Sequence, residues 1–541
     1  MPSKSVKRVL FSRWLIVLLF IFSLALVLHN SFSYLDPDFG WHYAVGREIW
    51  QNHAVPHLEH HLLPVAGQSW VDHEWLSNVL IYLTYNWGGY LLVSFLFALL
   101  TILIWYLLAQ ETIKHWLDNK TNSVVFWLLL LISLKASLPN LGVRVQEITV
   151  FFVVLLNIWL AQSVRQRKWP TWKIIVVPLL FWLWASLHGG FLIGLAIFTA
   201  WFFFRLILYW LPHKSNKGIN ILPKSVIIRS GLTLVLSWIA TCLTPYGLGL
   251  YQFLGDYGTS RAYLWCIVEW LPMTEALCSW RMVYFIIFGL ALALLIFHCC
   301  SHDKHDREMV LWLKQQDWWT LILSLILWIA AWRSLRHFPL FAVVSLPWMA
   351  GFFYHSWHDN LFQPDTWPNY LKWFVAVIVI LTSLLLIIDT HWSVHPEKDY
   401  CHTYPCVAMS YLRQSPYASW PTIVEYGWGG YFYWLWPEKP IFIDGRLPQY
   451  MWRGQSLIEH YGRFFKETEV NKTLDDYGLD VIVIPQPRPV HYNWAETLFL
   501  GRGLAEEDYY TLSDIVRWAM LKSPDWRLVH ADITAMIYVR Q

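Results

Sequence analysis

Trp14-Leu-Ile-Val-Leu-Leu-Phe-Ile-Phe-Ser-Leu-Ala-Leu-Val-Leu28 decides the fold class, and Leu35-Asp-Pro-Asp-Phe-Gly-Trp-His-Tyr43 follows it closely. The first stretch belongs to an apolar run over 11–31, which is long enough to span the hydrocarbon core of a bilayer. Four basic residues precede this run: Lys4, Lys7, Arg8 and Arg13. The run is too long for a typical signal-peptide core, and no small-x-small cleavage site follows it. We therefore interpret it as an uncleaved membrane anchor whose N-terminus lies inside.

The composition of all 541 residues has the same character. Hydrophobic residues make up 56% of the chain, charged residues only 14%, and the mean hydropathy is +0.38. Soluble domains carry about 25% charged residues, because a surface in water needs them. The composition therefore predicts a membrane protein and excludes disorder, coiled coil and collagen. A net charge of +3 is too small to indicate a nucleic-acid partner.

Eleven apolar runs predict eleven membrane spans. They lie at 11–31, 90–109, 123–139, 146–164, 171–187, 190–210, 226–243, 282–300, 317–332, 337–354 and 370–390. Lys and Arg concentrate in short cytoplasmic loops. In this topology, every connection on the same side of the membrane as the N-terminus contains Lys or Arg, except 355–369. Eleven crossings from an inner N-terminus place everything after residue 390 outside.

The predicted organisation is a polytopic α-helical bundle over 1–390, including a first outer loop at 32–89, and an extracytoplasmic domain over 391–541. In the second part, strand-like runs alternate with helix-like runs, which predicts a small α/β domain. The expected strands are Thr422–Tyr426, Ile441–Ile443, Asp480–Ile484 and Ile533–Val539, and the expected helices are 408–414, 455–468 and 509–521. Two cysteine pairs on the outer side are able to form disulfides: Cys266 with Cys278, and Cys401 with Cys406.

Polar residues near the spans gather on the predicted outer side. They are Asp36, Asp38, His42, Asp72, His73, Glu74, Lys135, Arg144, His188, Glu269, Arg333, Arg336 and His337. Transporters place their substrate and ion sites near the bilayer midplane, so this distribution argues against transport. It favours an outer cavity in which Arg binds a phosphate and a carboxylate takes or orients the proton of an acceptor.

Several of these residues keep two interpretations. Asp36 and Asp38 could face a cleft or hold a cation, or they could cap a helix and be solvated. His188 could line the cleft or make an interfacial hydrogen bond. Arg333 and Arg336 share one helical face and could bind the phosphate of a carrier or of a bulk lipid.

Two further carboxylates have structural alternatives of the same kind. Glu269 could order its own loop instead of lining the cleft. In Phe442-Ile-Asp-Gly-Arg446, Asp444 follows an apolar strand and could face a ligand at the strand end, but we favour a structural contact between Asp444 and Arg446.

An acidic D-x-D after the first span, followed by Trp41-His42 and a long outer loop, resembles the GT-C superfamily of membrane glycosyltransferases. Asp38-Phe-Gly-Trp-His-Tyr43 is similar to the acidic first-loop segment of oligosaccharyltransferases. Glu425-Tyr-Gly-Trp-Gly-Gly-Tyr431 departs from their W-W-D-Y-G signature, so transfer to an Asn sequon is not implied. The layout most resembles that of bacterial membrane proteins with this architecture. This resemblance implies that the protein lies in the bacterial plasma membrane with its N-terminus in the cytoplasm.

The resemblance implies an inverting glycosyltransferase that moves a sugar from a polyprenyl-phosphate-linked donor to a glycan, lipid or protein acceptor. Asp38, with Asp36 second, maps onto the catalytic base or metal ligand, and Mg²⁺ or Mn²⁺ is the cofactor that these carboxylates would suit. His42, Glu74, Arg144, His188, Glu269, Arg333, Arg336 and His337 are the expected substrate-binding residues. The alternative is a non-catalytic envelope protein that keeps the bundle for binding or assembly.

Overall fold

The computed structural model describes residues 4–117, 119, 123–210, 221–259, 267–276, 279–300, 317–357, 364–448, 450–466, 470–487 and 512–541. Contacts divide the chain into two compact units. The first consists of Met1–Tyr34, Ser94–Gly247 and Glu269–Trp392, and the second of Leu35–Val93, Leu248–Val268 and Ser393–Gln541. The first outer loop therefore belongs mostly to the same unit as the C-terminal part of the chain.

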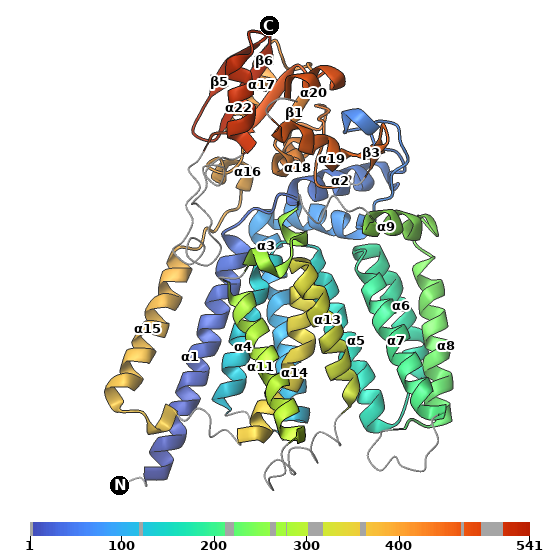
Figure 1. Ribbon diagram of the computed structural model, residues 1–541, viewed down its shortest axis with the longest axis vertical. Coiled ribbons are helices and arrows are strands. Elements are labelled where there is room, and N and C mark those ends of the chain that lie inside the picture. Colours follow the sequence, from blue (N-terminus) through green and yellow to red (C-terminus); the bar gives the residue numbers. More distant parts are fainter. Residues whose placement is uncertain are drawn as a thin grey trace. The chain divides into compact units, whose positions relative to one another are not determined.

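The first unit is a bundle of apolar helices (Figure 1). It contains α1 (Lys4–Phe32), most of α3 (Trp75–Trp116), α4 (Val124–Ser137), α5 (Gln146–Gln166), α6 (Thr171–Leu187), α7 (Phe191–Trp210), α8 (Lys224–Thr241), α11 (Trp280–Cys300), α13 (Trp318–Arg333), α14 (Phe338–Trp357) and α15 (Asn369–Ile388). Among the described residues, eight helices are long and apolar enough to cross a membrane, and three shorter apolar helices accompany them. Each of the eleven predicted spans falls on one of these helices. The chain is thus a multi-pass α-helical membrane protein.

The second predicted span coincides with only part of its helix. α3 begins at Trp75, but Gly88 and Gly89 inside it have non-helical backbone angles. Gly89 has φ 63°, and a Cβ atom there would lie 2.9 Å from the carbonyl oxygen of Val394. Glycine is required at this point, because other residues rarely adopt a positive φ. The kink explains why the apolar run begins near residue 90.

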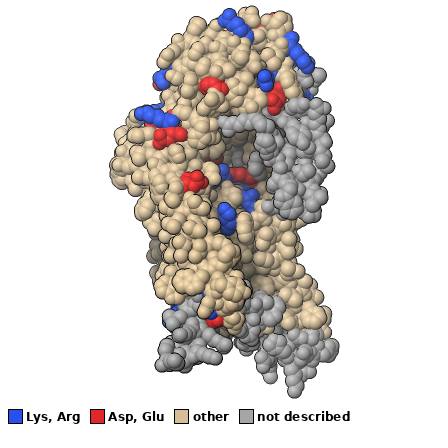
Figure 2. All heavy atoms as spheres, turned by 90° about the vertical axis from the view of Figure 1, so that its left-hand side faces the viewer, with Lys and Arg blue, Asp and Glu red and all other residues tan. Residues whose placement is uncertain are grey.

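The surface of the bundle agrees with a lipid environment. Only 6% of the most apolar part of α15 is buried inside the protein, although Ile, Leu, Val and aromatic residues make up most of this helix. On the face shown in Figure 2, charged side chains are sparse and most of the surface belongs to other residues. A hydrocarbon solvent tolerates this distribution, since apolar side chains lose nothing by facing lipid.

The second unit contains a four-stranded sheet in the order β1-β4-β6-β5. Its strands are β1 (Thr422–Val424), β4 (Val481–Pro485), β5 (Trp526–Ala531) and β6 (Ala535–Arg540), and only the β1–β4 pair is parallel. A short hairpin joins β2 (Met451–Trp452) to β3 (Gln455–Ser456). Helices complete the unit: α2 (Phe39–Asn52), α9 (Gly249–Thr259), α16 (Pro396–Asp399), α17 (Cys406–Gln414), α18 (Gly429–Leu435), α19 (Leu457–Gly462), α20 (Val470–Tyr477) and α22 (Leu512–Lys522). The C-terminal part is therefore the small α/β domain expected from the sequence.

One expected strand needs correction, and β5 was missed. Ile441–Ile443 is not a strand of its own; instead Ile441 forms single parallel bridges to Leu62 and to Thr422. Residues of the first outer loop thus continue the hydrogen bonding of the sheet beyond β1. β5 was not expected, because its sequence Trp-Arg-Leu-Val-His-Ala mixes polar and apolar residues, as an edge strand with one solvated side does.

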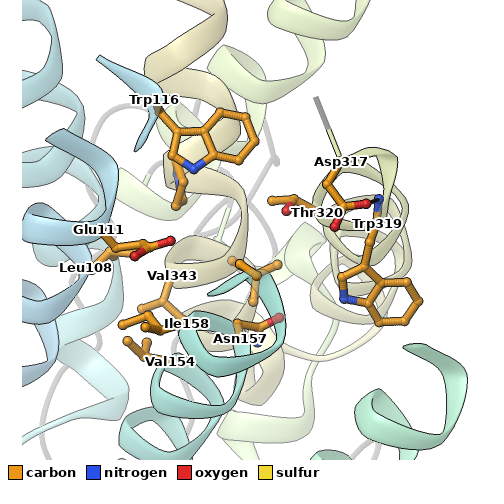
Figure 3. Close-up of a pocket in the computed structure, with 13 residues that line it drawn as sticks. Leu108, Glu111, Trp116, Val154, Asn157, Ile158, Asp317, Trp319, Thr320 and Val343 are labelled. Carbon is orange, nitrogen blue, oxygen red and sulfur yellow. Dashed lines mark hydrogen bonds between the residues drawn. The ribbon is translucent and has the colours of Figure 1, made fainter. Parts of the chain in front are cut away.

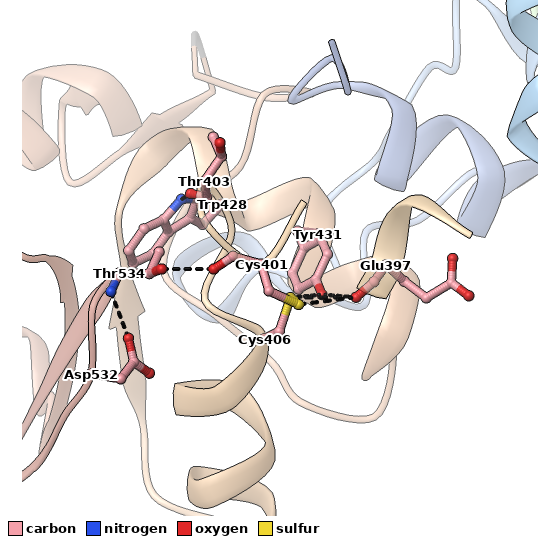
Figure 4. Close-up of a disulfide and its surroundings, with 8 residues drawn as sticks. All are labelled: Glu397, Cys401, Thr403, Cys406, Trp428, Tyr431, Asp532 and Thr534. Atoms are coloured by element: carbon pink, nitrogen blue, oxygen red, sulfur yellow. Dashed lines mark hydrogen bonds between the residues drawn. A yellow bond between two sulfur atoms is a disulfide. The ribbon is translucent and has the colours of Figure 1, made fainter. Parts of the chain in front are cut away.

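A disulfide joins Cys401 to Cys406 (Figure 4), with an S–S distance of 2.06 Å. Thr534 Oγ1 donates a hydrogen bond of 2.7 Å to the carbonyl oxygen of Cys401, and Trp428 Nε1 donates one of 3.1 Å to the carbonyl oxygen of Thr403. These bonds connect the disulfide loop to the end of the chain and to the start of α18. One of the two expected cysteine pairs is therefore bridged, whereas Cys266 and Cys278 lie outside the described residues.

Candidate functional site

The carboxylate of Asp38 stands immediately before α2. Asp38 is the N-cap residue by position, but its side chain makes no capping hydrogen bond. Instead Trp41 Nε1 donates a hydrogen bond of 2.9 Å to Asp38 Oδ1. Asp36 Oδ1 in turn accepts a bond of 2.9 Å from the backbone amide of Asp38. The two carboxylates therefore have different roles locally, since Asp36 fixes the turn and Asp38 is held by the indole.

Glycines bring two distant segments against this turn. A Cβ atom on Gly445 would lie only 2.3 Å from Asp38 Oδ1, so the backbone at 445 touches the carboxylate. A Cβ atom on Gly40 would lie 2.2 Å from the carbonyl oxygen of Gly430, which places α2 directly on α18. Segments 36–41, 429–431 and 444–446 thus meet around Asp38.

A buried ion-pair cluster fixes the turn that carries Gly445. Arg446 Nε donates a hydrogen bond of 2.8 Å to Asp444 Oδ2, and Arg446 Nη1 lies 3.0 Å from Glu59 Oε2. The guanidinium carbon of Arg446 lies 4.8 Å from the ring centroid of Trp70 and 4.5 Å from that of Tyr433. Arg446, Asp444 and Glu59 are 4%, 0% and 1% exposed. The expected structural contact between Asp444 and Arg446 is confirmed, and Glu59 adds a second carboxylate.

A second buried network joins α2 to the start of α3. His42 Nδ1 lies 2.5 Å from Asn78 Oδ1, and Asn78 Nδ2 donates a bond of 2.8 Å to Asp72 Oδ2. Burial lowers the pKa of His42 to about 4, although the Asn78 bond and the charge of Asp36 oppose this. Burial also raises the pKa of Asp72 to about 6. His42 Nε2 lies 3.9 Å from Glu74 Oε2, so two of the expected substrate-binding residues lie close together.

The expected residues of the first unit form a second group. Arg144, just before α5, makes an ion pair with Glu269, and both side chains are 22% exposed. Glu269 belongs to the short helix η4 (Val268–Trp270), and its carbonyl oxygen accepts a bond of 3.3 Å from Ser334 Oγ. The guanidinium of Arg336 lies 5.1 Å from the ring centroid of Trp270. His337 contacts the same indole, with ring centroids 6.2 Å apart.

His188 and Arg333 have different surroundings. His188 Nδ1 accepts a bond of 3.0 Å from the amide of Gly190 and lies 2.7 Å from Thr149 Oγ1. Thr149 also accepts a bond of 3.0 Å from Trp184 Nε1. His188 is thus a well-bonded residue at the end of α6. Arg333 ends α13 and is exposed.

The expected site residues therefore fall into two groups. Asp36, Asp38, His42 and Glu74 belong to the second unit, whereas Arg144, His188, Glu269, Arg333, Arg336 and His337 belong to the first. Each group has the internal contacts described above. Their assembly into one cavity stays a prediction.

A cavity in the bundle that has some polar side chains in its lining is too small to be this site (Figure 3). Its volume is about 60 Å³, and its lining includes Glu111, Asn157, Asp317 and Thr320. Sites for small molecules are roughly 300–1,000 Å³, so this cavity accommodates only a few water molecules. Asp317 is also paired with Arg205 and caps α13 by accepting from the amide of Trp319.

Sequence reasoning missed Glu59, Trp70, Tyr433 and Asn78, which position the residues that it selected. The signal for Glu59 was weak: a single carboxylate among His57, His60 and His61 in an outer loop. Its partner lies 387 positions away, a separation that no local pattern reveals.

No protein-family model and no curated protein sequence matches this chain. Among solved structures, it is similar to the archaeal oligosaccharyltransferase AglB from Archaeoglobus fulgidus. The form of that enzyme tethered to an acceptor peptide with the NVT sequon matches with a TM-score of 0.50 and 14% identity, over 87% of this chain and 69% of that chain.

Two further AglB structures also match. The complex with an inhibitory peptide and a dolichol-phosphate gives a TM-score of 0.49 at 14% identity, over 87% of this chain and 69% of that chain. The complex with zinc and sulfate gives 0.47 at 14% identity, over 86% and 68%. At this identity the likeness concerns the fold alone: the fold of this chain is similar to that of the tethered oligosaccharyltransferase.

Proposed function

We propose that the chain is a membrane glycosyltransferase that moves a sugar from a polyprenyl-phosphate-linked donor to an acceptor at the outer face of a bacterial plasma membrane. Asp38 would take or orient the acceptor proton, with Asp36 shaping its turn. Arg144 and Arg336 would hold the donor phosphate, with Arg333 at the rim. His42, Glu74, His188, Glu269 and His337 would line the cleft.

The observation that carries this proposal is the setting of the Asp38 carboxylate. It is half-buried, it accepts from Trp41, and the backbone at Gly445 limits its position. A general base must be held in one geometry and still accept a proton from the substrate. An ionised carboxylate has about four lone-pair sites, so the bond from Trp41 orients Asp38 without consuming its acceptor capacity.

The donor and acceptor follow from chemistry and from fold. Guanidinium groups suit the planar, bidentate binding of phosphate, and Arg144 and Arg336 stand at one end of a bundle that lies in lipid. AglB, whose fold this chain shares, has been captured with an acceptor peptide. A peptide, a glycan or a lipid would serve as the acceptor here.

A divalent cation suits this site only in part. The described residues contain no group of three or more His, Cys, Asp and Glu side chains arranged for a metal ion. Mg²⁺ typically binds to one or two carboxylates and completes its shell with water and phosphate oxygens. Asp36 and Asp38 would be the two carboxylates for Mg²⁺ or Mn²⁺, which would neutralise charge on the phosphate.

The test is sugar transfer by membranes that contain Asp38→Asn, given a radiolabelled polyprenyl-phosphate sugar. Loss of a general base reduces such a rate by about 10²–10⁴-fold. Asn keeps an oxygen that can accept from Trp41, so the fold should survive. Asp525→Asn, at an exposed position of the second unit, is the matched control and should transfer like the wild type. Equal transfer by Asp38→Asn would contradict the role of Asp38, and wild-type membranes without any transfer would favour the non-catalytic alternative.

A further inference from the structure

The bundle contains an apolar groove that the proposed site does not use. It has a volume of about 430 Å³ and runs between α1, α3 and α4. Its lining is Leu19, Phe20, Ser23, Leu24, Val27, Thr101, Ile102, Trp105, Tyr106, Ala109, Gln110, Ile113, Trp127, Leu130 and Leu134. This volume falls in the range of roughly 300–1,000 Å³ in which small-molecule ligands bind.

Three of the polar side chains in the groove walls are hydrogen-bonded within the protein. Ser23 Oγ donates to the carbonyl oxygen of Leu19 at 2.8 Å, and Trp105 Nε1 donates to Ser133 Oγ at 3.3 Å. Thr101 Oγ1 donates to Glu147 Oε1 at 2.5 Å. The walls therefore offer mainly apolar contacts, which suit a hydrocarbon chain rather than a sugar or a headgroup.

One end of the groove adjoins the loop that carries Arg144. Glu147, which accepts from the groove residue Thr101, also accepts from the amide of Gly142 at 3.0 Å. On α1, one turn beyond the groove residue Val27, Asn30 Nδ2 donates to the carbonyl oxygen of Leu141 at 3.0 Å. A chain in the groove would thus leave it beside loop 138–145.

A cation stands at the same end. Lys135 directly follows the groove residue Leu134 and is half-buried. None of the ion pairs among the described residues includes it. A half-buried ammonium group in a membrane-spanning helix is costly without an anion, and the phosphate of a lipid would supply one.

The length of the groove identifies the kind of chain. From Thr101 to Ile113 it follows α3 for 12 residues, which is about 18 Å at 1.5 Å per residue. One leaflet contributes only half of a hydrocarbon core of about 30 Å. The groove is therefore slightly longer than one leaflet is deep, and a single long hydrocarbon chain fits along it.

We propose that this groove binds the isoprenoid chain of a polyprenyl phosphate, with Lys135 at its mouth facing the phosphate. The inference rests on the proposed function, because it assigns a place to the tail of the same donor. Lipid chains are as apolar as the groove, so the groove selects its occupant by close packing along its length rather than by hydrophobicity.

The experiment measures binding of a tritiated long-chain polyprenyl phosphate to the full-length protein in phosphatidylcholine nanodiscs. Geranyl phosphate, with the same headgroup and a short chain, is the comparison ligand. Ser23→Trp fills the groove, and Ile21→Trp adds the same side chain to an exposed position of α1 outside it. Ala109→Ile is a milder second filling variant.

We expect Ser23→Trp and Ala109→Ile to weaken long-chain binding about fivefold or more, a factor that corresponds to about 1 kcal/mol. Geranyl phosphate binding should not change in either variant, and Ile21→Trp should resemble the wild type. Lys135→Ala should weaken the binding of both ligands by the same factor. Unchanged long-chain binding by both filling variants would overturn the proposal, as would equal displacement by excess phosphatidylglycerol, which would assign the groove to bulk phospholipid.

Binding and transfer are measured on the same preparation. Long-chain binding that depends on Ser23, without any sugar transfer, would contradict the proposed function and leave the groove assignment standing. Transfer together with binding that ignores Ser23→Trp would contradict the groove alone.

Discussion

Arg446 and Arg144 both pair with carboxylates, yet their surroundings differ in kind. Arg446 is 4% exposed, contacts Asp444 and Glu59, and has its guanidinium 4.8 and 4.5 Å from two aromatic ring centroids. Arg144 pairs with Glu269, and both side chains are 22% exposed. The first guanidinium has its charge neutralised inside the protein, whereas the second remains accessible to a ligand that competes for it.

The difference shows how to separate structural from binding residues in this chain. Buried charges hold backbone segments in place, because breaking such a pair strands a charge away from water. Partly exposed ion pairs contribute little to stability, about 0–1 kcal/mol, and the cation of such a pair can exchange one anion for another. We therefore expect substitutions in the buried networks to change stability and substitutions in the exposed pairs to change affinity for the donor.

The largest effect should follow from Arg446→Met. It would leave the carboxylates of Asp444 and Glu59 buried without a cation, which typically costs about 3–5 kcal/mol. The thermal unfolding midpoint of the purified protein measures this loss, with the exposed Arg527→Met as the control. An unchanged midpoint would show that the cluster does not stabilise the fold and would remove the contrast with Arg144.

The second prediction concerns the pH dependence of the network of His42 and Asp72. The pKa of His42 is about 4 when folded, so between pH 6.5 and 4 only the unfolded state gains the proton, and stability falls as the pH falls. The pKa of Asp72 is about 6, so it takes up its proton in the folded state first, and its contribution rises as the pH falls. Each effect amounts to about 3 kcal/mol over its range, and in the wild type they largely cancel.

Single substitutions should separate the pH-dependent contributions of His42 and Asp72 to stability. Asp72→Asn leaves the His42 effect alone, so its unfolding midpoint should drop steeply from pH 7 to pH 4. His42→Asn leaves the Asp72 effect alone, so its midpoint should rise over the same range. Parallel pH profiles for both variants would contradict the opposed pKa shifts.

How much the sequence predicted depends on the range of the interactions. The spans were predictable, because the length and composition of a run such as 370–390 alone decide whether it suits lipid. The contact between Asp444 and Arg446 was predictable from two-residue spacing. The approach of Gly445 to Asp38 was not, since over 400 residues separate them and packing alone brings them together. For the same reason, Ile441–Ile443 looked like a strand of the tail although one of its neighbours is Leu62.

The third prediction concerns the close packing of Gly445 against Asp38. Gly445→Ala places a Cβ atom only 2.3 Å from the present position of Asp38 Oδ1, so the carboxylate must move. A misplacement of about 1 Å can cost roughly 10²-fold in rate, while stability should change less than in Arg446→Met. Gly462→Ala, where a Cβ atom meets nothing within 4 Å, is the control. In an Asp38→Asn background, Gly445→Ala should add little further loss; full additivity would mean that Gly445 does not act through Asp38.

The smallest effects on stability and rate should come from substitutions of the partly exposed arginines. Arg144→Lys keeps the charge but loses the planar guanidinium that binds two oxygens of a phosphate. We therefore expect the KM for the donor to rise about tenfold, which corresponds to about 1.4 kcal/mol. The kcat and the unfolding midpoint should be nearly unchanged. Arg333→Ala, at an exposed helix end, should stay within about 0.5 kcal/mol of the wild type in stability and shift KM less than Arg144→Lys. A fall in the unfolding midpoint of Arg144→Lys as large as that of Arg446→Met would place Arg144 among the structural residues. Arg336, whose guanidinium lies over Trp270, would then have to bind the phosphate. In that case Arg336→Lys would be the variant with the raised KM.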